Sequence, residues 1–213
     1  MVLGIRLLDK LVTPASDPAE AVPQEVDPKL SVHYQKALES ASEGLHAQAL
    51  EELKESLREN GAFAEAYHEL GKAYRNLGDL NRAIKAFQSA IRIHPQRVET
   101  YTELGVAYDS AGNFLEAIKT YMRVLRLTPD SIETRNDLGM AYFNIGGYTE
   151  AAKAFNQALQ IQESNVRAHF GLGLVYVDLR RRELAMAEHT TLQDMGEEKM
   201  ASLLMDHINR EFY

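Results

Sequence analysis

The sequence predicts an all-α protein in which antiparallel helix pairs stack into a solenoid. Two observations predict this fold. The stretch from Tyr67 to Pro95 is repeated with many of its residues unchanged from Tyr101 to Pro129, 34 residues later. Within each copy apolar residues recur at intervals of three and four, the period of an α-helix. A glycine near the middle of each copy, Gly78 or Gly112, indicates a turn, so each copy is expected to fold as helix, turn and helix.

Aligning the chain on the 34-residue step places residues of one kind in columns. These are a leucine column (Leu70, Leu104, Leu138, Leu172), a glycine column (Gly71, Gly105, Gly139, Gly173), a tyrosine column (Tyr74, Tyr108, Tyr142, Tyr176) and an alanine column (Ala83, Ala117, Ala151, Ala185). Small side chains at a crossing let two helices approach to about 8 to 10 Å. The glycine and alanine columns are therefore expected at the crossings, with leucine and aromatic side chains filling the space beside them.

These columns resemble the tetratricopeptide repeat, a 34-residue pattern of Leu-Gly, Tyr, Gly, Ala, an aromatic residue, Ala and Pro. Five units are predicted, at 30–63, 64–97, 98–131, 132–165 and 166–196. The first unit is degenerate, the fourth has Glu163 where proline is expected, and the fifth has Arg180 for the turn glycine and His189 for the aromatic residue. The resemblance implies a right-handed superhelix, in which the first helix of each pair lines a concave groove.

The ends of the chain differ from the repeats. Residues 1–13 are expected to form a short amphipathic helix, and residues 14–29, with four of the six prolines, a linker. Residues 197–213 carry apolar residues on one helical face and are predicted to cap the last repeat. Arg6, Asp9 and Lys10 interrupt the apolar start before a signal-peptide core of usual length forms, and no apolar run is long enough to span a membrane. A cytoplasmic location is expected.

Composition restricts the classes of function. The 213 residues carry a formal net charge of −8 and include no cysteine. Negative charge disfavours nucleic acid and favours basic partners, and the absence of cysteine rules out disulfides and lipidated cysteine. No phosphate-binding glycine loop, His-Glu-x-x-His pair or nucleophile elbow occurs. The chain is therefore predicted to be no enzyme and to use neither a cofactor nor a metal.

The resemblance implies that ligands contact the groove at the second, fifth, sixth, ninth, twelfth and thirteenth positions of each first helix. In this chain those positions hold an acidic set: Glu65, Glu69, Glu99, Glu103, Asp109, Glu133 and Asp137. The helix macrodipole accounts for the carboxylates in first turns. It accounts less well for like charges four residues further on, which are mutually unfavourable. A site for basic side chains is predicted, with a merely solvated face as the alternative.

Further along, the same positions become apolar or neutral: Asn136, Met140, Phe143, Asn144, Phe170, Leu174 and Val177. An apolar stripe in a groove requires a cover. The helix after Gly196, the segment from Val2 to Val12 of the same or another copy, and a foreign peptide are three candidate covers, of which the chain itself is favoured. Arg180, Arg181 and Arg182 lie in the last predicted turn, either as a solvated turn or as an anion contact.

The sequence thus predicts a non-catalytic scaffold or adaptor, whose groove binds a protein or peptide segment with basic and apolar residues. One alternative is a self-assembling scaffold, in which the N-terminal amphipathic helix docks into the groove of a neighbouring copy to give a homo-oligomer. Another is a peripheral membrane assembly factor, although two basic residues in that helix, Arg6 and Lys10, predict weak membrane binding at most.

Overall fold

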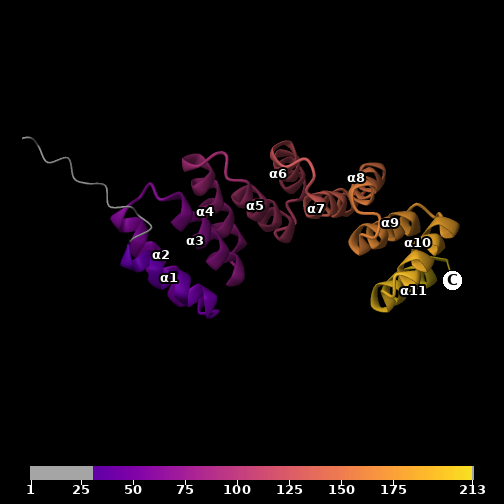
Figure 1. Ribbon diagram of the computed structural model, residues 1–213, viewed down its shortest axis with the longest axis horizontal. Coiled ribbons are helices and arrows are strands. Elements are labelled where there is room, and N and C mark those ends of the chain that lie inside the picture. Colours follow the sequence, from indigo (N-terminus) through magenta and orange to yellow (C-terminus); the bar gives the residue numbers. More distant parts are fainter. Residues whose placement is uncertain (1–30, 213) are drawn as a thin grey trace, which may run out of the picture.

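The computed structural model describes residues 31–212, and all regular secondary structure in that range is helical (Figure 1). The helices are α1 (Val32–Ser42), α2 (His46–Glu59), α3 (Ala64–Asn76), α4 (Leu80–Ile93), α5 (Val98–Ser110), α6 (Phe114–Leu127), α7 (Ile132–Asn144), α8 (Tyr148–Ile161), α9 (Val166–Asp178), α10 (Arg182–Asp194) and α11 (Glu198–Phe212). The predicted N-terminal helix and linker, 1–13 and 14–29, lie outside the described residues. The predicted all-α superhelix of helix pairs is confirmed.

The helices form two layers along an arch. Each helix packs against the next in sequence, and the odd-numbered helices α1 to α9 also contact one another in order. Figure 1 shows these odd-numbered helices along the inner side of the arch and α2, α4, α6 and α8 along its outer side. We call the inward surface of α1, α3, α5, α7 and α9 the groove face. Equivalent positions on these helices therefore line up from one repeat to the next.

The turns inside the pairs require a left-handed backbone residue. Gly78, Gly112 and Gly146 have φ of 81°, 73° and 77°, a region that glycine adopts without a Cβ clash. The amide of Gly78 donates to the carbonyl of Arg75 and that of Asp79 to the carbonyl of Tyr74, each at 2.9 Å, which satisfies the end of α3. The last turn has Arg180 in this position at φ 57°.

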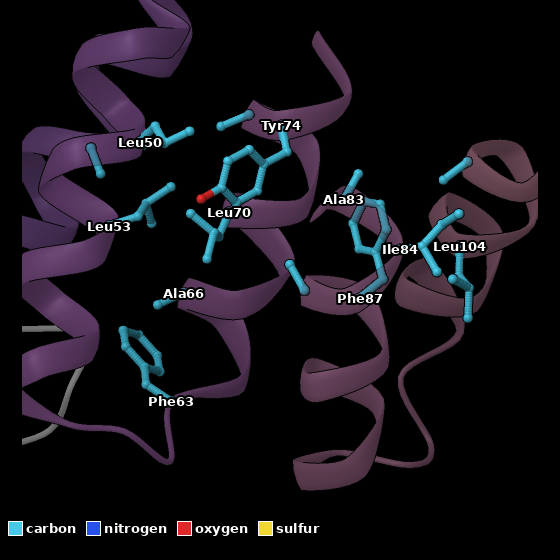
Figure 2. Close-up of a cluster of buried hydrophobic side chains, with 14 of the residues drawn as sticks. Leu50, Leu53, Phe63, Ala66, Leu70, Tyr74, Ala83, Ile84, Phe87 and Leu104 are labelled. Atoms are coloured by element: carbon cyan, nitrogen blue, oxygen red, sulfur yellow. The ribbon is translucent and has the colours of Figure 1, made fainter. Parts of the chain in front are cut away.

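Buried side chains form successive core clusters along the stack. Figure 2 shows part of the first cluster, in which buried side chains from α2, α3, α4 and α5 follow one another: Leu50, Leu53, Leu70, Tyr74, Phe87 and Leu104. The glycine column lies against the aromatic column of the paired helix. A Cβ added to Gly71 would lie 2.5 Å from the Phe87 ring, and one added to Gly105 would lie 2.5 Å from Tyr121. Glycine is needed here because the helices cross at contact distance.

The packing of the last helix pair, α9 and α10, is completed by a helix outside the repeats. The aromatic column of this pair holds His189, and the space over Gly173 is filled by Leu204 of α11, whose δ-carbon lies 2.3 Å from an added Cβ. Leu204 and Ile208 are fully buried, and α11 packs against both α9 and α10. The C-terminal helix thus closes the apolar end of the stack, as a capping repeat does.

We expect Gly173→Ala to lower the free energy of unfolding by about 1 to 2 kcal/mol, because the new methyl group displaces Leu204 from the closing helix. Urea denaturation measures the change. Gly61→Ala is the matched control, since its nearest neighbour to an added Cβ is a carbonyl oxygen at 3.8 Å. Equal stability of the Gly173 variant and the wild type would contradict the packing described for α11.

Candidate partner-binding groove

The predicted acidic residues belong to α3, α5 and α7, and several have basic partners within the chain. Glu69 pairs with Lys72 at 2.8 Å on α3. Glu103 of α5 pairs with Arg75 of α3 at 3.2 Å, and Asp137 of α7 pairs with Arg167 of α9 at 2.7 Å. The last two ion pairs join neighbouring repeats. At Glu69, Glu103 and Asp137 the predicted site for basic side chains is thus already occupied by basic residues of the chain itself.

The first-turn carboxylates are positioned differently. Glu65 is partly buried near the start of α3, whereas Glu99 and Glu133 are exposed in the first turns of α5 and α7. Glu99 Oε2 lies 3.8 Å from Arg97 Nε, at the edge of ion-pair distance. Carboxylates at these positions interact favourably with the positive end of the helix dipole, so their placement has a structural cause as well.

Asp109, near the end of α5, differs from the rest of the acidic set. It is partly buried, and its Oδ1 is buried without a hydrogen-bond partner among residues 31–212. Burial and then the negative charge of Asp137 raise the pKa of the Asp109 carboxyl. The two carboxylates, on α5 and α7, thus interact unfavourably, and the buried Asp109 oxygen has no hydrogen-bond donor in residues 31–212 to offset this.

His68 lies at the junction of α3 and α5. It is 5% exposed, and its Nδ1 lies 3.0 Å from the Thr100 hydroxyl. Burial, assisted by the positive charge of Arg97, lowers the pKa of His68 to about 4. Its imidazole is therefore neutral at neutral pH. The residue joins two repeats, because His68 belongs to α3 and Thr100 to α5.

The apolar and neutral residues of the predicted site differ in how deeply they are buried. Leu174 and Val177 are 9% and 2% exposed and belong to the core cluster that includes α11 residues. The helix after Gly196, one of the three candidate covers, thus packs with them, and they are not open to a foreign partner. The expectation that Asn136 contacts a partner is corrected. Asn136 is 2% exposed, and its amide donates to Asn165 Oδ1 at 2.9 Å in the junction between two repeats.

Four residues of that set keep accessible surface on α7 and α9. Met140, Phe143 and Phe170 are partly buried, and Asn144 is exposed. The Phe143 ring packs edge to face on Tyr148 with centroids 5.7 Å apart. Met140, Phe143 and Phe170, which we call the apolar patch, thus stand directly after the Asp109 and Asp137 carboxylates along the groove face.

Comparison with known families agrees with this geometry. A model described as tetratricopeptide repeat matches residues 63–130, and a second, described as TPR repeat, matches residues 141–179. The chain is a tetratricopeptide-repeat protein. Arrays of this family are protein-interaction scaffolds, and this TPR protein is one. A search of curated proteins gives no significant match.

Solved TPR structures have the same fold at low sequence identity. A crystal structure of MamA is 23% identical with a TM-score of 0.72 and covers 76% of this chain and 95% of its own. MamA from Desulfovibrio magneticus RS-1 is 20% identical, with a TM-score of 0.76 and coverage of 81% and 97%. YrrB, described as a TPR protein with an unusual peptide-binding site, is 21% identical, with a TM-score of 0.72 and coverage of 82% and 90%.

The arginine run of this TPR protein is partly engaged within the chain. Arg180 Nη2 lies 2.8 Å from the Glu211 carboxylate of α11, and the guanidinium lies 6.0 Å from the Phe212 ring centroid. Arg180, for which the sequence left a solvated turn and an anion contact as alternatives, thus pairs with a carboxylate of its own chain. Arg181 is the N-cap residue of α10 and Arg182 begins that helix, both exposed.

Sequence reasoning missed the basic side of the groove. Lys72, Arg75 and Arg167 occupy the ninth, twelfth and second positions of their helices, which are all ligand-facing columns of a TPR unit. Listing every charged residue in those columns, and not the acidic ones alone, would have found them. Among residues 31–212 no group of three or more His, Cys, Asp or Glu side chains is arranged to hold a metal ion. None of the helices in that range has the length and apolar character needed to cross a membrane.

Proposed function

We propose that this TPR protein is a non-catalytic scaffold whose groove face binds a partner segment that carries both basic and apolar residues. The observation that carries the proposal is the order of side chains along the groove. The Asp109 and Asp137 carboxylates on α5 and α7 are followed by the apolar patch on α7 and α9. A single bound segment would therefore meet negative charge first and apolar surface next.

The two parts of the groove would contribute differently to binding. Burying the apolar patch supplies affinity, because removal of apolar surface from water is favourable and insensitive to salt. The carboxylates supply selectivity and speed of association, and screening by salt weakens both. The peptide-binding site named for YrrB, a protein of the same fold, supports a peptide as the ligand.

Affinity capture with cross-linking tests the proposal with three baits: the wild type, Met140→Glu and Met122→Glu. Met140 belongs to the apolar patch, whereas Met122 lies on α6 in the outer layer and is 41% exposed. Partner recovery is expected to fall about tenfold or more with Met140→Glu, because the new charge must be desolvated at the interface. Met122→Glu should recover the partner as the wild type does.

Two results would contradict this function. Recovery of the same partner by Met140→Glu places the binding surface elsewhere. Recovery of nothing but further copies of the bait favours the self-assembling alternative, in which the segment from Val2 to Val12, apolar with Arg6 and Lys10, occupies the groove of a neighbour.

A further inference from the structure

Successive odd-numbered helices contact one another, and we call each such contact a seam. The same helix positions face each other at every seam. At the seam of α3 and α5, Arg75, the twelfth residue of its helix, pairs at 3.2 Å with Glu103, the sixth residue of the next. One repeat later the same two positions hold Asp109 on α5 and Asp137 on α7. The arginine of the first seam is thus replaced by a carboxylate in the second.

At the second seam a basic side chain pairs with Asp137 but not with Asp109. Asp137 Oδ1 accepts from Arg167 of α9 at 2.7 Å, but Asp109 Oδ1 is buried and accepts nothing from residues 31–212. The pKa of Asp109 is raised by burial and by Asp137, which fits two carboxylates facing one another. The fully buried phenol of Tyr121 is affected by both, since Asp137 and Asp109 add to burial in raising its pKa.

We propose that the α5–α7 seam binds the guanidinium group of an arginine from the partner segment, which takes the place that Arg75 holds one seam earlier. The inference rests on the proposed function and specifies its ligand. A guanidinium fits better than an ammonium because it is planar, carries five donors and can contact carboxylates on two sides at once. It would pair with the accessible part of the Asp109 carboxylate and offset the negative charge that Asp137 adds.

The seam of α7 and α9 indicates which kind of residue should follow the arginine in the bound segment. At α7 and α9 the twelfth position is Phe143 and the facing sixth position is Gly171, with Met140 and Phe170 beside them. Neighbouring packed helices lie about 8 to 10 Å apart. A polyproline II segment rises about 3.1 Å per residue with three residues per turn, so residues three apart lie on one side at about 9 Å. The preferred ligand is therefore an arginine and an apolar residue separated by two positions.

A library of blocked nine-residue peptides, selected in parallel on the full-length wild type, Asp109→Asn and Asp130→Asn, tests the inference. Asp130 lies exposed in the turn before α7 and is the control for loss of one charge. We expect the wild type and Asp130→Asn to enrich arginine with an apolar residue three positions away. With Asp109→Asn the arginine enrichment should fall about tenfold while the apolar preference remains, since a charge-assisted hydrogen bond is lost.

Thermal unfolding separates this binding role from a structural one. A carboxyl whose pKa is raised by folding destabilises the folded state at neutral pH, so Asp109→Asn should have a higher Tm than the wild type. A lower Tm together with unchanged arginine enrichment would overturn the inference. If the wild type selects apolar peptides with no preference for arginine, the inference is also overturned, but the proposed function stands. No peptide bound by any of the three would overturn both.

Discussion

Replacing Phe155 by alanine is expected to lower the free energy of unfolding by about 3 to 5 kcal/mol, the cost of removing a fully buried aromatic side chain. The Phe155 ring packs on two glycines at once. A Cβ added to Gly139 of α7 would lie 2.6 Å from it, and one added to Gly171 of α9 would lie 2.4 Å from it. The ring therefore joins the fourth helix pair to the fifth, and its loss should weaken the junction as well as the pair.

Hydrogen exchange read by mass spectrometry, together with urea denaturation, checks where the loss falls. In a repeat array stability depends on contacts between neighbours, so Phe155→Ala should speed exchange in α9, α10 and α11. Phe87→Ala is the matched control, because Phe87 is equally buried but meets only Gly71 among the core glycines, and it should affect α3 and α4 most. The same exchange pattern in both variants would contradict a junction role for Phe155.

Acidification should destabilise the protein through His68. Its pKa is about 4 in the folded chain against an ordinary 6.5, so the folded state favours the neutral imidazole. The stability that this provides is complete above about pH 6.5 and is lost as the pH falls toward 4. The loss is up to about 3 kcal/mol, because each tenfold difference in proton affinity is worth about 1.4 kcal/mol.

Urea denaturation at several pH values tests this dependence in the wild type, His68→Gln and His207→Gln. Glutamine retains a polar group that can bond to Thr100 but does not titrate, so His68→Gln should lose less stability than the wild type between pH 6.5 and 4. His207 is exposed on α11, and its replacement should leave the slope unchanged. Identical slopes for His68→Gln and the wild type would show that His68 is not the group responsible.

The fold was predictable because each column of the repeat reports a local contact. Gly71 and Phe87 lie 16 residues apart in one helix pair, and Gly105 and Tyr121 have the same spacing in the next. The sequence therefore shows the same glycine–aromatic contact more than once. The turn at Arg180 was predicted by position, although its residue departs from the pattern.

The candidate site was only partly predictable, because its charges are balanced across repeats. Glu103 meets Arg75 from the preceding unit, and Asp137 meets Arg167 from the following one. The order of residues on one helix does not predict such a pair, because the length of the side chains and the geometry between the two helices determine whether it forms. The burial of Leu174 is different, because it involves α11, the helix that the sequence named as one of three candidate covers.

The closing helix also gives the array a direction. With Leu204 seated on Gly173, the surface on which another repeat would stack is already occupied by the chain itself. The fifth unit is adapted to this neighbour, with Arg180 tied to Glu211 and His189 in the aromatic column. A further repeat could therefore not stack directly on α9 and α10 in the way that each helix pair stacks on the one before it, because α11 holds that place.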